Sequence, residues 1–200
     1  GTSGLRHGLA VSSVRGHGWG EALLNRLSGS PQAFETTPVP PEFHGELRPY
    51  QHRGFSWLVY LRSCGFGACL ADDMGLGKTV QALAFLLHCK AKQSAHKPTL
   101  IVGPLSILGN WMHEAARFAP TLACHLHHGA WRWHGDSFAR EMQHYDVVIT
   151  SYAMLHRDYT DLRKVNWSCI ILDEAQNIKN PDTRQSQVAR ALPADYRIAL

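Results

Sequence analysis

Along residues 45–200, short continuous runs of hydrophobic residues alternate with segments in which hydrophobic residues have helical spacing. Short continuous apolar runs, which are typical of strands buried on both faces, cover residues 69–71, 99–102, 122–127, 146–150, 169–172 and 196–200. Between them, helical spacing predicts helices from Pro49 to the glycines at 65–67, and at 80–89, 106–118, 136–143, 151–156 and 182–191, with Ser106 and Ser151 as caps. This alternation predicts an α/β fold in which right-handed crossovers join a parallel sheet covered by helices on both faces.

The turn between the first strand and the next helix has the composition of a phosphate-binding loop. Residues 69–79 read Cys-Leu-Ala-Asp-Asp-Met-Gly-Leu-Gly-Lys-Thr. Gly75 and Gly77 let backbone N–H groups face phosphate oxygens, Lys78 can reach the β- and γ-phosphates, and the Thr79 hydroxyl can hold Mg²⁺. Asp72 stands where the general pattern has its first glycine, so an ordinary strand-to-helix connection is the alternative.

A second polar feature follows the apolar run at 169–172, where Asp173 and Glu174 stand side by side. Ligands collect at the carboxyl ends of parallel strands. One carboxylate can bind Mg²⁺ through its water shell, and the next can orient or deprotonate an attacking water. Such a pair alone is usually a solvated turn, but together with a phosphate loop it predicts a catalytic site.

The N-terminal part differs in composition from the rest. Residues 1–44 are expected to form an arm, with a short amphipathic stretch at 19–27 and a proline-rich linker at 28–41. Residues 45–200 are expected to form the folded lobe. The last predicted strand ends at Leu200 with no helix after it, which predicts that the chain is part of a longer protein.

Composition indicates a globular protein that works in a reducing compartment. The 200 residues carry a net charge of +4, which is compatible with nucleic acid but does not require it. The 5 cysteines are scattered and mostly lie in apolar segments, so we expect reduced core residues and not disulfides. No apolar run approaches the roughly 20 residues of a membrane span, and we expect no signal peptide.

The histidine-rich segment at 124–134 could support a different chemistry. Its candidate metal ligands are Cys124, His125, His127, His128 and His134. Strand alternation points neighbours to opposite faces and no second ligand pair completes a zinc set, so zinc is disfavoured. Trp131 and Trp133 could stack on bases, although an exposed aromatic loop or a partly buried lid is favoured. A catalytic cysteine is disfavoured, because Cys69 and Cys169 fall in predicted core strands.

Five motifs in fixed order resemble the first RecA-like lobe of a Swi/Snf-type ATPase, within helicase-like superfamily two. They are Leu-Arg-Pro-Tyr-Gln at 47–51, Asp-Asp-Met-Gly-Leu-Gly-Lys-Thr at 72–79, Leu-Ile-Val-Gly-Pro-Leu-Ser at 100–106 with Asn110 and Trp111, Asp-Val-Val-Ile-Thr-Ser-Tyr at 146–152, and Asp-Glu-Ala-Gln at 173–176 with Asn-Ile-Lys-Asn-Pro at 177–181. Asp72 is the usual residue of that family. Asp-Glu-Ala-Gln, in place of Asp-Glu-Gly-His, resembles the bacterial branch.

The resemblance implies a RecA-like P-loop NTPase lobe and a role for each matching residue. It assigns ATP binding to Gln51, which would read the adenine edge, and to Asp73, Met74, Gly75, Leu76, Gly77, Lys78 and Thr79. It assigns catalysis to Lys78, Asp173, Glu174 and Gln176, with Mg²⁺ held by Thr79 and Asp173. Gln176 would link the nucleotide state to the DNA-binding face. It assigns contacts with the DNA backbone to Pro104, Ser106, Thr150 and Ser151.

The implied activity is that of a double-stranded-DNA-dependent ATPase and translocase that remodels protein–DNA complexes in the bacterial cytoplasm, at the nucleoid. The partners would be double-stranded DNA, DNA-bound proteins and a second RecA-like lobe that residues 1–200 do not contain. That lobe supplies arginine fingers, so this chain alone is expected to bind nucleotide weakly and hydrolyse it poorly. A nucleotide-binding switch or interaction module without translocation is the alternative. A small-molecule kinase is a third and less favoured one.

Overall fold

The computed structural model describes residues 35–72 and 75–200. The chain divides into two compact units, Gly1–Glu35 and Thr36–Leu200. The amphipathic stretch predicted at 19–27 lies outside the described residues. Within the described residues, no helix is long and apolar enough to cross a membrane.

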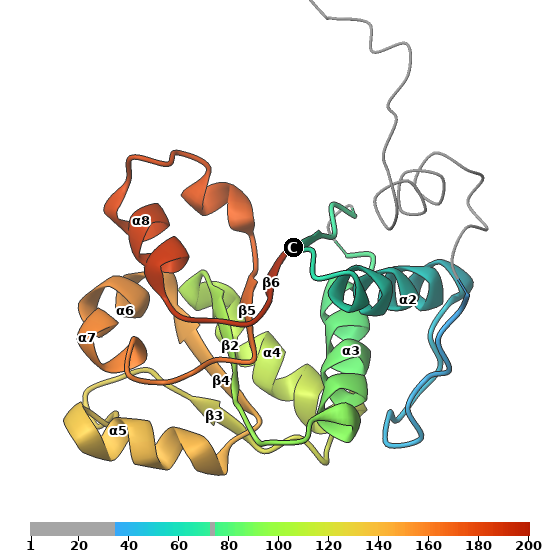
Figure 1. The fold of residues 1–200 in the computed structure, drawn as a ribbon, viewed down its shortest axis with the longest axis horizontal. Coiled ribbons are helices and arrows are strands. Elements are labelled where there is room, and N and C mark those ends of the chain that lie inside the picture. Colours follow the sequence, from blue (N-terminus) through green and yellow to red (C-terminus); the bar gives the residue numbers. More distant parts are fainter. Residues whose placement is uncertain (1–34, 73–74) are drawn as a thin grey trace, which may run out of the picture. The chain divides into compact units, whose positions relative to one another are not determined.

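The second unit is built on a six-stranded parallel sheet in the order β1-β6-β5-β2-β4-β3 (Figure 1). The strands are β1 (Ala68–Cys69), β2 (Thr99–Gly103), β3 (Cys124–Leu126), β4 (Val147–Ser151), β5 (Cys169–Leu172) and β6 (Arg197–Ala199). The helices are α2 (Pro49–Ser63), α3 (Lys78–Lys92), α4 (Leu105–Phe118), α5 (Gly135–Glu141), α6 (Tyr152–Arg157), α7 (Tyr159–Leu162) and α8 (Arg184–Ala191), with 3₁₀ turns η1 (Met142–His144) and η2 (Ala175–Ile178). The predicted α/β fold is confirmed.

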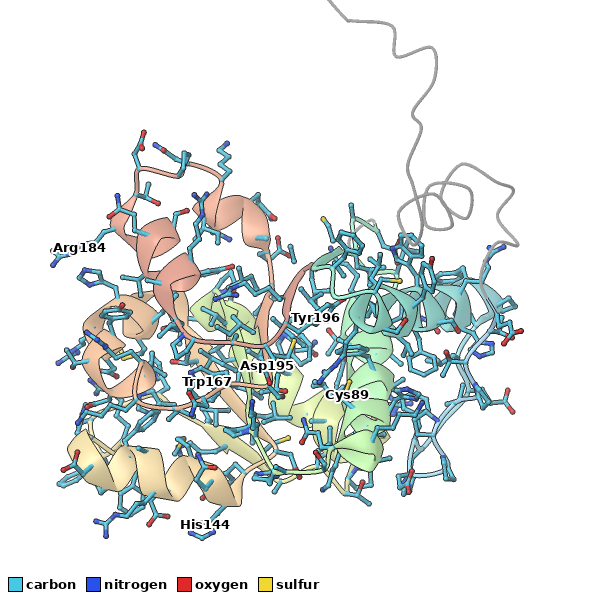
Figure 2. The ribbon with its side chains drawn as sticks, viewed as in Figure 1. Cys89, His144, Trp167, Arg184, Asp195 and Tyr196 are labelled. Atoms are coloured by element: carbon cyan, nitrogen blue, oxygen red, sulfur yellow. The ribbon has the colours of Figure 1, made fainter. Side chains whose placement is uncertain are left out.

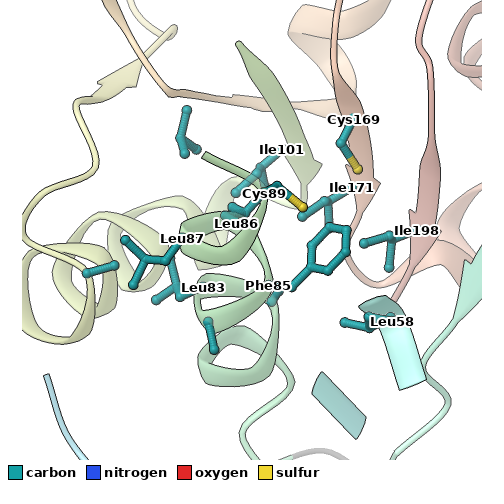
Figure 3. Close-up of a cluster of buried hydrophobic side chains, with 14 of the residues drawn as sticks. Leu58, Leu83, Phe85, Leu86, Leu87, Cys89, Ile101, Cys169, Ile171 and Ile198 are labelled. Atoms are coloured by element: carbon teal, nitrogen blue, oxygen red, sulfur yellow. The ribbon is translucent and has the colours of Figure 1, made fainter. Parts of the chain in front are cut away.

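Helices cover both faces of this sheet, and the strand sequences explain how. Successive side chains of a strand point to opposite faces. In β2, Ile101 joins a core cluster with α2, α3 and α4, whereas Leu100 and Val102 join a second cluster with α5, α6, α7 and α8. Figure 3 shows the first cluster, where Phe85, Leu86 and Cys89 of α3 lie beside Ile101 and Ile171 of the sheet. Because both faces are buried, the central strands are mainly apolar, as predicted, and their few polar residues lie at the strand ends.

Several boundaries differ from the prediction. β1 is an edge strand that ends at Cys69, since the chain leaves the sheet toward the phosphate loop, and Cys69 is exposed and not in the core. Ser106 does not cap α4, because the helix already begins at Leu105 and its N-cap is Pro104. Ser151 does cap α6, with its hydroxyl accepting a bond from the Met154 N–H. Helix α7 was not predicted.

Candidate nucleotide-binding site

The phosphate loop connects β1 to α3 and owes its path to two glycines. Gly75 and Gly77 have φ angles of 83° and 76°, in the left-handed region that only glycine adopts at little cost. Gly77 is also the N-cap of α3, and a Cβ there would lie 2.4 Å from Gln51 Nε2. The predicted site residues Asp73 and Met74 lie outside the described residues. For Gly77, both the backbone conformation and the space around it therefore require glycine.

Helix α3 presents its N-terminus to this loop, as predicted. The Gln81 N–H makes the first helical bond, to the Gly77 carbonyl at 3.2 Å, so the N–H groups of residues 78–80 have no partner within the helix. The side chains of Lys78 and Thr79 are half-buried and have no hydrogen bond or ion pair with any described residue. A helix N-terminus with free N–H groups beside an unpaired lysine is a site for phosphate.

The first turn of α2 holds the loop from the other side. The Tyr50 hydroxyl and the Gln51 amide both donate to the Leu76 carbonyl, at 3.2 and 3.1 Å. Gln51 Oε1 accepts the Arg48 N–H at 2.9 Å, and the side chain is only 9% exposed. The amide keeps one N–H and one lone pair for a ligand. Its adenine contact stays a prediction, and its observed role is to fix the loop.

Asp72, the departure from the general phosphate-loop pattern, has a partner that the sequence did not reveal. Gln81 Nε2 donates to Asp72 Oδ2 at 3.1 Å, and Gln81 is fully buried one turn into α3. The one available signal was a polar residue on an otherwise apolar helix. Gln81 therefore ties the beginning of the loop to the helix that follows it.

Asp173 directly follows β5 and is held by three hydrogen bonds besides its own strand pairing. Its Oδ2 accepts the Trp111 indole N–H at 2.7 Å, and its Oδ1 accepts the Glu174 N–H at 2.9 Å. Its carbonyl accepts the Tyr152 hydroxyl at 2.9 Å. The residue is 9% exposed. Each carboxylate oxygen keeps a lone pair for a metal-bound water.

Glu174 has an unusual backbone for a catalytic candidate. Its φ of 52° is the one positive value among non-glycine residues that the structure describes. Strained backbone of this kind persists where its surroundings hold it and is common at functional sites. The Gln176 amide donates to Glu174 Oε2, and the Asn177 side chain donates to the Glu174 carbonyl at 2.8 Å. Gln176 therefore contacts the predicted catalytic carboxylate directly.

Strand β6 lies between β1 and β5, and the two halves of the site therefore both lie at the carboxyl end of the sheet. The Leu70 N–H donates to the Ala199 carbonyl at 2.8 Å, and the Leu200 N–H donates to the Leu172 carbonyl at 2.9 Å. Neighbouring strands lie about 4.8 Å apart, so the ends of β1 and β5 are separated by about 10 Å. A triphosphate with Mg²⁺ spans such a distance. The free N–H groups, the unpaired lysine, the Thr79 hydroxyl and the Asp173 carboxylate together fit Mg²⁺–ATP.

The four residues predicted to contact DNA fall into two pairs. Ser106 is exposed in the first turn of α4, and Pro104 before it is half-buried. Thr150 and Ser151 are buried at the end of β4, where the Thr150 hydroxyl donates to the His127 carbonyl at 2.9 Å and the Ser151 hydroxyl caps α6. The latter two hydroxyls are therefore engaged within the lobe.

The histidine-rich segment forms a buried ion network. Asp158 accepts bonds from the Arg132 guanidinium at 2.5 and 2.8 Å and from His127 Nε2 at 2.9 Å, and all three side chains are buried. Within the described residues, no group of three or more metal-binding side chains occurs. Trp131 is 99% exposed and Trp133 is 43% exposed, so the two tryptophans lie in an exposed aromatic loop, one of the two arrangements that the sequence favoured.

Two buried cysteines, Cys169 and Cys89, lack the environment of a nucleophile. Cys169 is fully buried in β5, and burial raises the pKa of its thiol far above the ordinary value. Cys89 in α3 is also buried, and burial raises its thiol pKa to about 11. A thiol with a raised pKa carries little thiolate at neutral pH, so the structure offers no activated cysteine among these two.

The fold and the site together define a RecA-like lobe of the P-loop type. The model of the SNF2-related domain matches residues 50–200. The chain therefore belongs to the SNF2-related family, as the sequence motifs had indicated.

Individual relatives agree with this assignment. The chain is 52% identical over 179 residues to YwqA of Bacillus subtilis, named as an ATP-dependent helicase/translocase, covering 90% of this chain and 19% of that protein. It is 36% identical over 169 residues to the chromatin-remodeling ATPase ISW1 of Saccharomyces cerevisiae, covering 84% of this chain and 15% of that protein. The chain thus spans less than a fifth of either relative.

Solved structures give the same result at the level of the fold. The Sulfolobus solfataricus SWI2/SNF2 ATPase core in complex with double-stranded DNA superposes with a TM-score of 0.75 at 42% identity, covering 84% of this chain and 34% of that one. The same core domain described without DNA gives a TM-score of 0.74 at 40% identity, with 86% and 34% coverage.

Proposed function

We propose that this chain is the ATP-binding lobe of a double-stranded-DNA-dependent ATPase and translocase that remodels protein–DNA complexes. The observation that carries the proposal is the convergence of two elements at one edge of the sheet. The phosphate loop at the start of α3 and the Asp173–Glu174 pair after β5 lie on either side of β6. Membership of the SNF2-related family and the similarity to the bacterial protein YwqA support the activity. The protein would act in the bacterial cytoplasm, at the nucleoid.

Each residue of the site has a distinct task in this proposal. Residues 75–79 and the free N–H groups of α3 would bind the phosphates, with Lys78 neutralising their charge. Thr79 and Asp173 would hold Mg²⁺, which when bound stabilises the negative charge that develops on the transferred phosphoryl group. Glu174 would orient the attacking water, and the Gln176 amide would set the direction of its carboxylate. Gln51 would contact adenine while it keeps the loop in place.

Duplex DNA would bind at the same carboxyl edge. The exposed Ser106 hydroxyl and the N–H groups at the start of α4 are suited to phosphate contacts that carry no sequence information. Thr150 and Ser151 would act through their backbone, because their hydroxyls are already bonded inside the lobe. The double-stranded DNA bound by the Sulfolobus relative supports this choice of partner.

Efficient hydrolysis would require a second RecA-like lobe. Arginine fingers in P-loop enzymes raise kcat by about 10³–10⁵. We therefore expect residues 1–200 alone to bind ATP weakly and hydrolyse it poorly. A nucleotide-binding switch without translocation is the second candidate, but the Asp173–Glu174 pair favours the motor, because binding alone does not require a residue that activates water.

ATP hydrolysis with and without duplex DNA tests the proposal in the full-length protein that contains this chain. We expect duplex DNA to stimulate hydrolysis, and Lys78→Ala to abolish it. Lys92→Ala is the matched control, because it removes an exposed lysine from the far end of the same helix and is expected to keep the activity. A rate that ignores DNA would contradict the translocase and favour the switch. A DNA-stimulated rate from residues 1–200 alone would contradict the requirement for a second lobe.

A further inference from the structure

Asp173 receives hydrogen bonds from two buried aromatic residues that come from different segments of the chain. We infer that Trp111 and Tyr152 are positioning residues that connect the proposed DNA-contact segments to the carboxylate proposed to hold Mg²⁺. The inference deepens the proposed function and rests on it for the DNA connection. The placement of Asp173 by these two side chains stands on the geometry alone.

Trp111 connects Asp173 to helix α4. The indole is 1% exposed, and its Nε1–H donates to Asp173 Oδ2 at 2.7 Å. Helix α4 begins directly after Pro104 and carries Ser106 in its first turn. Residues 105 and 111 lie about 9 Å apart along one rigid helix, at 1.5 Å per residue. A movement of the start of α4 when Ser106 engages a phosphate would therefore reach the carboxylate without an intervening flexible segment.

Tyr152 connects Asp173 to helix α6. It is the first residue of that helix, immediately after Ser151, and its hydroxyl donates to the Asp173 carbonyl at 2.9 Å. The side chain is 6% exposed. This bond fixes the backbone of Asp173, whereas Trp111 fixes the carboxylate.

The two donors approach Asp173 from opposite faces of the sheet. Trp111 belongs to the core cluster that α2, α3 and α4 form with one face, and Tyr152 belongs to the cluster on the other face. Helices on both faces of the sheet therefore hold Asp173 at the carboxyl end of β5, the same end of the sheet at which the phosphate loop lies. Phenylalanine at either position would keep an aromatic ring in the core and remove the hydrogen bond to Asp173, so the contribution of each donor can be measured separately.

The variants Trp111→Phe and Tyr152→Phe each remove one donor and retain an aromatic ring. The molecule offers a matched control for both. Trp167 is fully buried and donates its indole N–H to the Leu162 carbonyl at 2.9 Å, and Tyr196 is 5% exposed and donates to the Leu58 carbonyl at 3.4 Å. Figure 2 labels both control residues, and their bonds involve none of the site residues. Trp167→Phe and Tyr196→Phe therefore report what the loss of a buried aromatic hydrogen bond does to the fold alone.

Two measurements on the full-length protein decide the inference. The first is the affinity for a fluorescent ATP analogue with Mg²⁺ and with EDTA. Residues that orient metal ligands typically contribute 10–100-fold to metal affinity, so we expect Trp111→Phe to weaken the Mg²⁺-dependent part of binding about tenfold. The affinity in EDTA should stay unchanged. The second is the ratio of hydrolysis rates with and without duplex DNA, which should fall several-fold in Trp111→Phe and Tyr152→Phe and stay at the wild-type value in both controls.

The outcomes separate this inference from the proposed function. Equal effects of Trp111→Phe and Trp167→Phe, or no effect of either site variant on Mg²⁺-dependent binding, would overturn the positioning of Asp173. A fall of stimulated and unstimulated rates by the same factor would overturn the connection to DNA. A wild-type rate that ignores DNA would refute the proposed function and this connection together, while the Mg²⁺ measurement still decides the positioning. Tyr152→Phe removes a single oxygen, so it keeps the test open if Trp111→Phe does not fold.

Discussion

Two helical glycines of this lobe should respond in opposite ways to the same substitution. A Cβ added to Gly54 in α2 would lie 1.9 Å from Gln81 Oε1, whereas nothing lies within 4 Å of a Cβ added to Gly109 in α4. Gln81 is fully buried, and its amide holds Asp72 at the start of the phosphate loop. Gly54→Ala must therefore displace a buried amide whose Nε2 is hydrogen-bonded to Asp72.

The expected magnitudes follow from these contacts. Alanine is favoured over glycine inside a helix by about 1 kcal/mol, and Gly109→Ala should gain most of this in its free energy of unfolding. In Gly54→Ala the same gain is opposed by overpacking, at about 1–3 kcal/mol, and by an unsatisfied buried polar group, at about 1–3 kcal/mol. Because the displaced atom is the end of a side chain and not backbone, we expect a net loss of about 1–3 kcal/mol.

Urea unfolding followed by circular dichroism measures both variants on the same chain. The double variant Gly54→Ala with Gln81→Ala should recover part of the loss, because the smaller side chain vacates the space that the methyl group needs. Affinity for a fluorescent ATP analogue should fall in Gly54→Ala and stay unchanged in Gly109→Ala. If Gly54→Ala stabilises the protein as much as Gly109→Ala does, Gln81 is free to move and its role in supporting the loop is refuted.

Two further predictions concern the buried ion network beside the aromatic loop. Asp158→Asn leaves the Arg132 guanidinium buried without its carboxylate and should lower the free energy of unfolding, measured in urea, by about 3–5 kcal/mol. The control Asp136→Asn removes an exposed carboxylate and should leave the free energy of unfolding nearly unchanged. Similar losses in both variants would contradict the importance of burial. Burial lowers the pKa of His125 and of His127 below the ordinary 6.5, although Asp158 opposes this for His127. As the pH falls, these histidines therefore bind protons in the unfolded chain before they do so in the folded chain. The free energy of unfolding should be unaffected by them above about pH 6.5 and should decline as the pH falls below it. Unfolding measured at about pH 7.5 and about pH 5.5 checks the sign, and equal or higher stability at the lower pH would contradict it.

The candidate site residues whose positions in helices, strands and turns were predicted correctly are those that the local sequence specifies. The phosphate loop needs glycines because of its backbone angles, and Lys78 opens a helix whose apolar spacing is visible in the sequence. Asp173 and Glu174 follow an apolar run that reads as a buried strand. These features depend on a residue and its near neighbours, so composition and spacing were enough to place them on one edge of a parallel sheet.

The parts that were missed all depend on partners far along the chain. Trp111 and Asp173 are 62 positions apart, and nothing in either local sequence indicates that an indole meets the carboxylate. The burial of the Thr150 hydroxyl against the His127 carbonyl was not visible in the local sequence either, and its contact with DNA stays a prediction. Cys69 reads as a core residue, but the position of β1 at the edge of the sheet leaves it exposed.

The sequence by itself determined the class of this protein, because hydrophobic period, glycine geometry and the order of the motifs are local properties that survive without a structure. Tertiary structure alone decided how the site is held. Packing of α4 and α6 on opposite faces sets the direction of the donors that reach Asp173, and packing of α2 on α3 sets how Gln51 and Gln81 secure the phosphate loop. The side-chain directions follow from the close packing of the whole core, in which segments far apart in the sequence contact one another, so no single segment determines them.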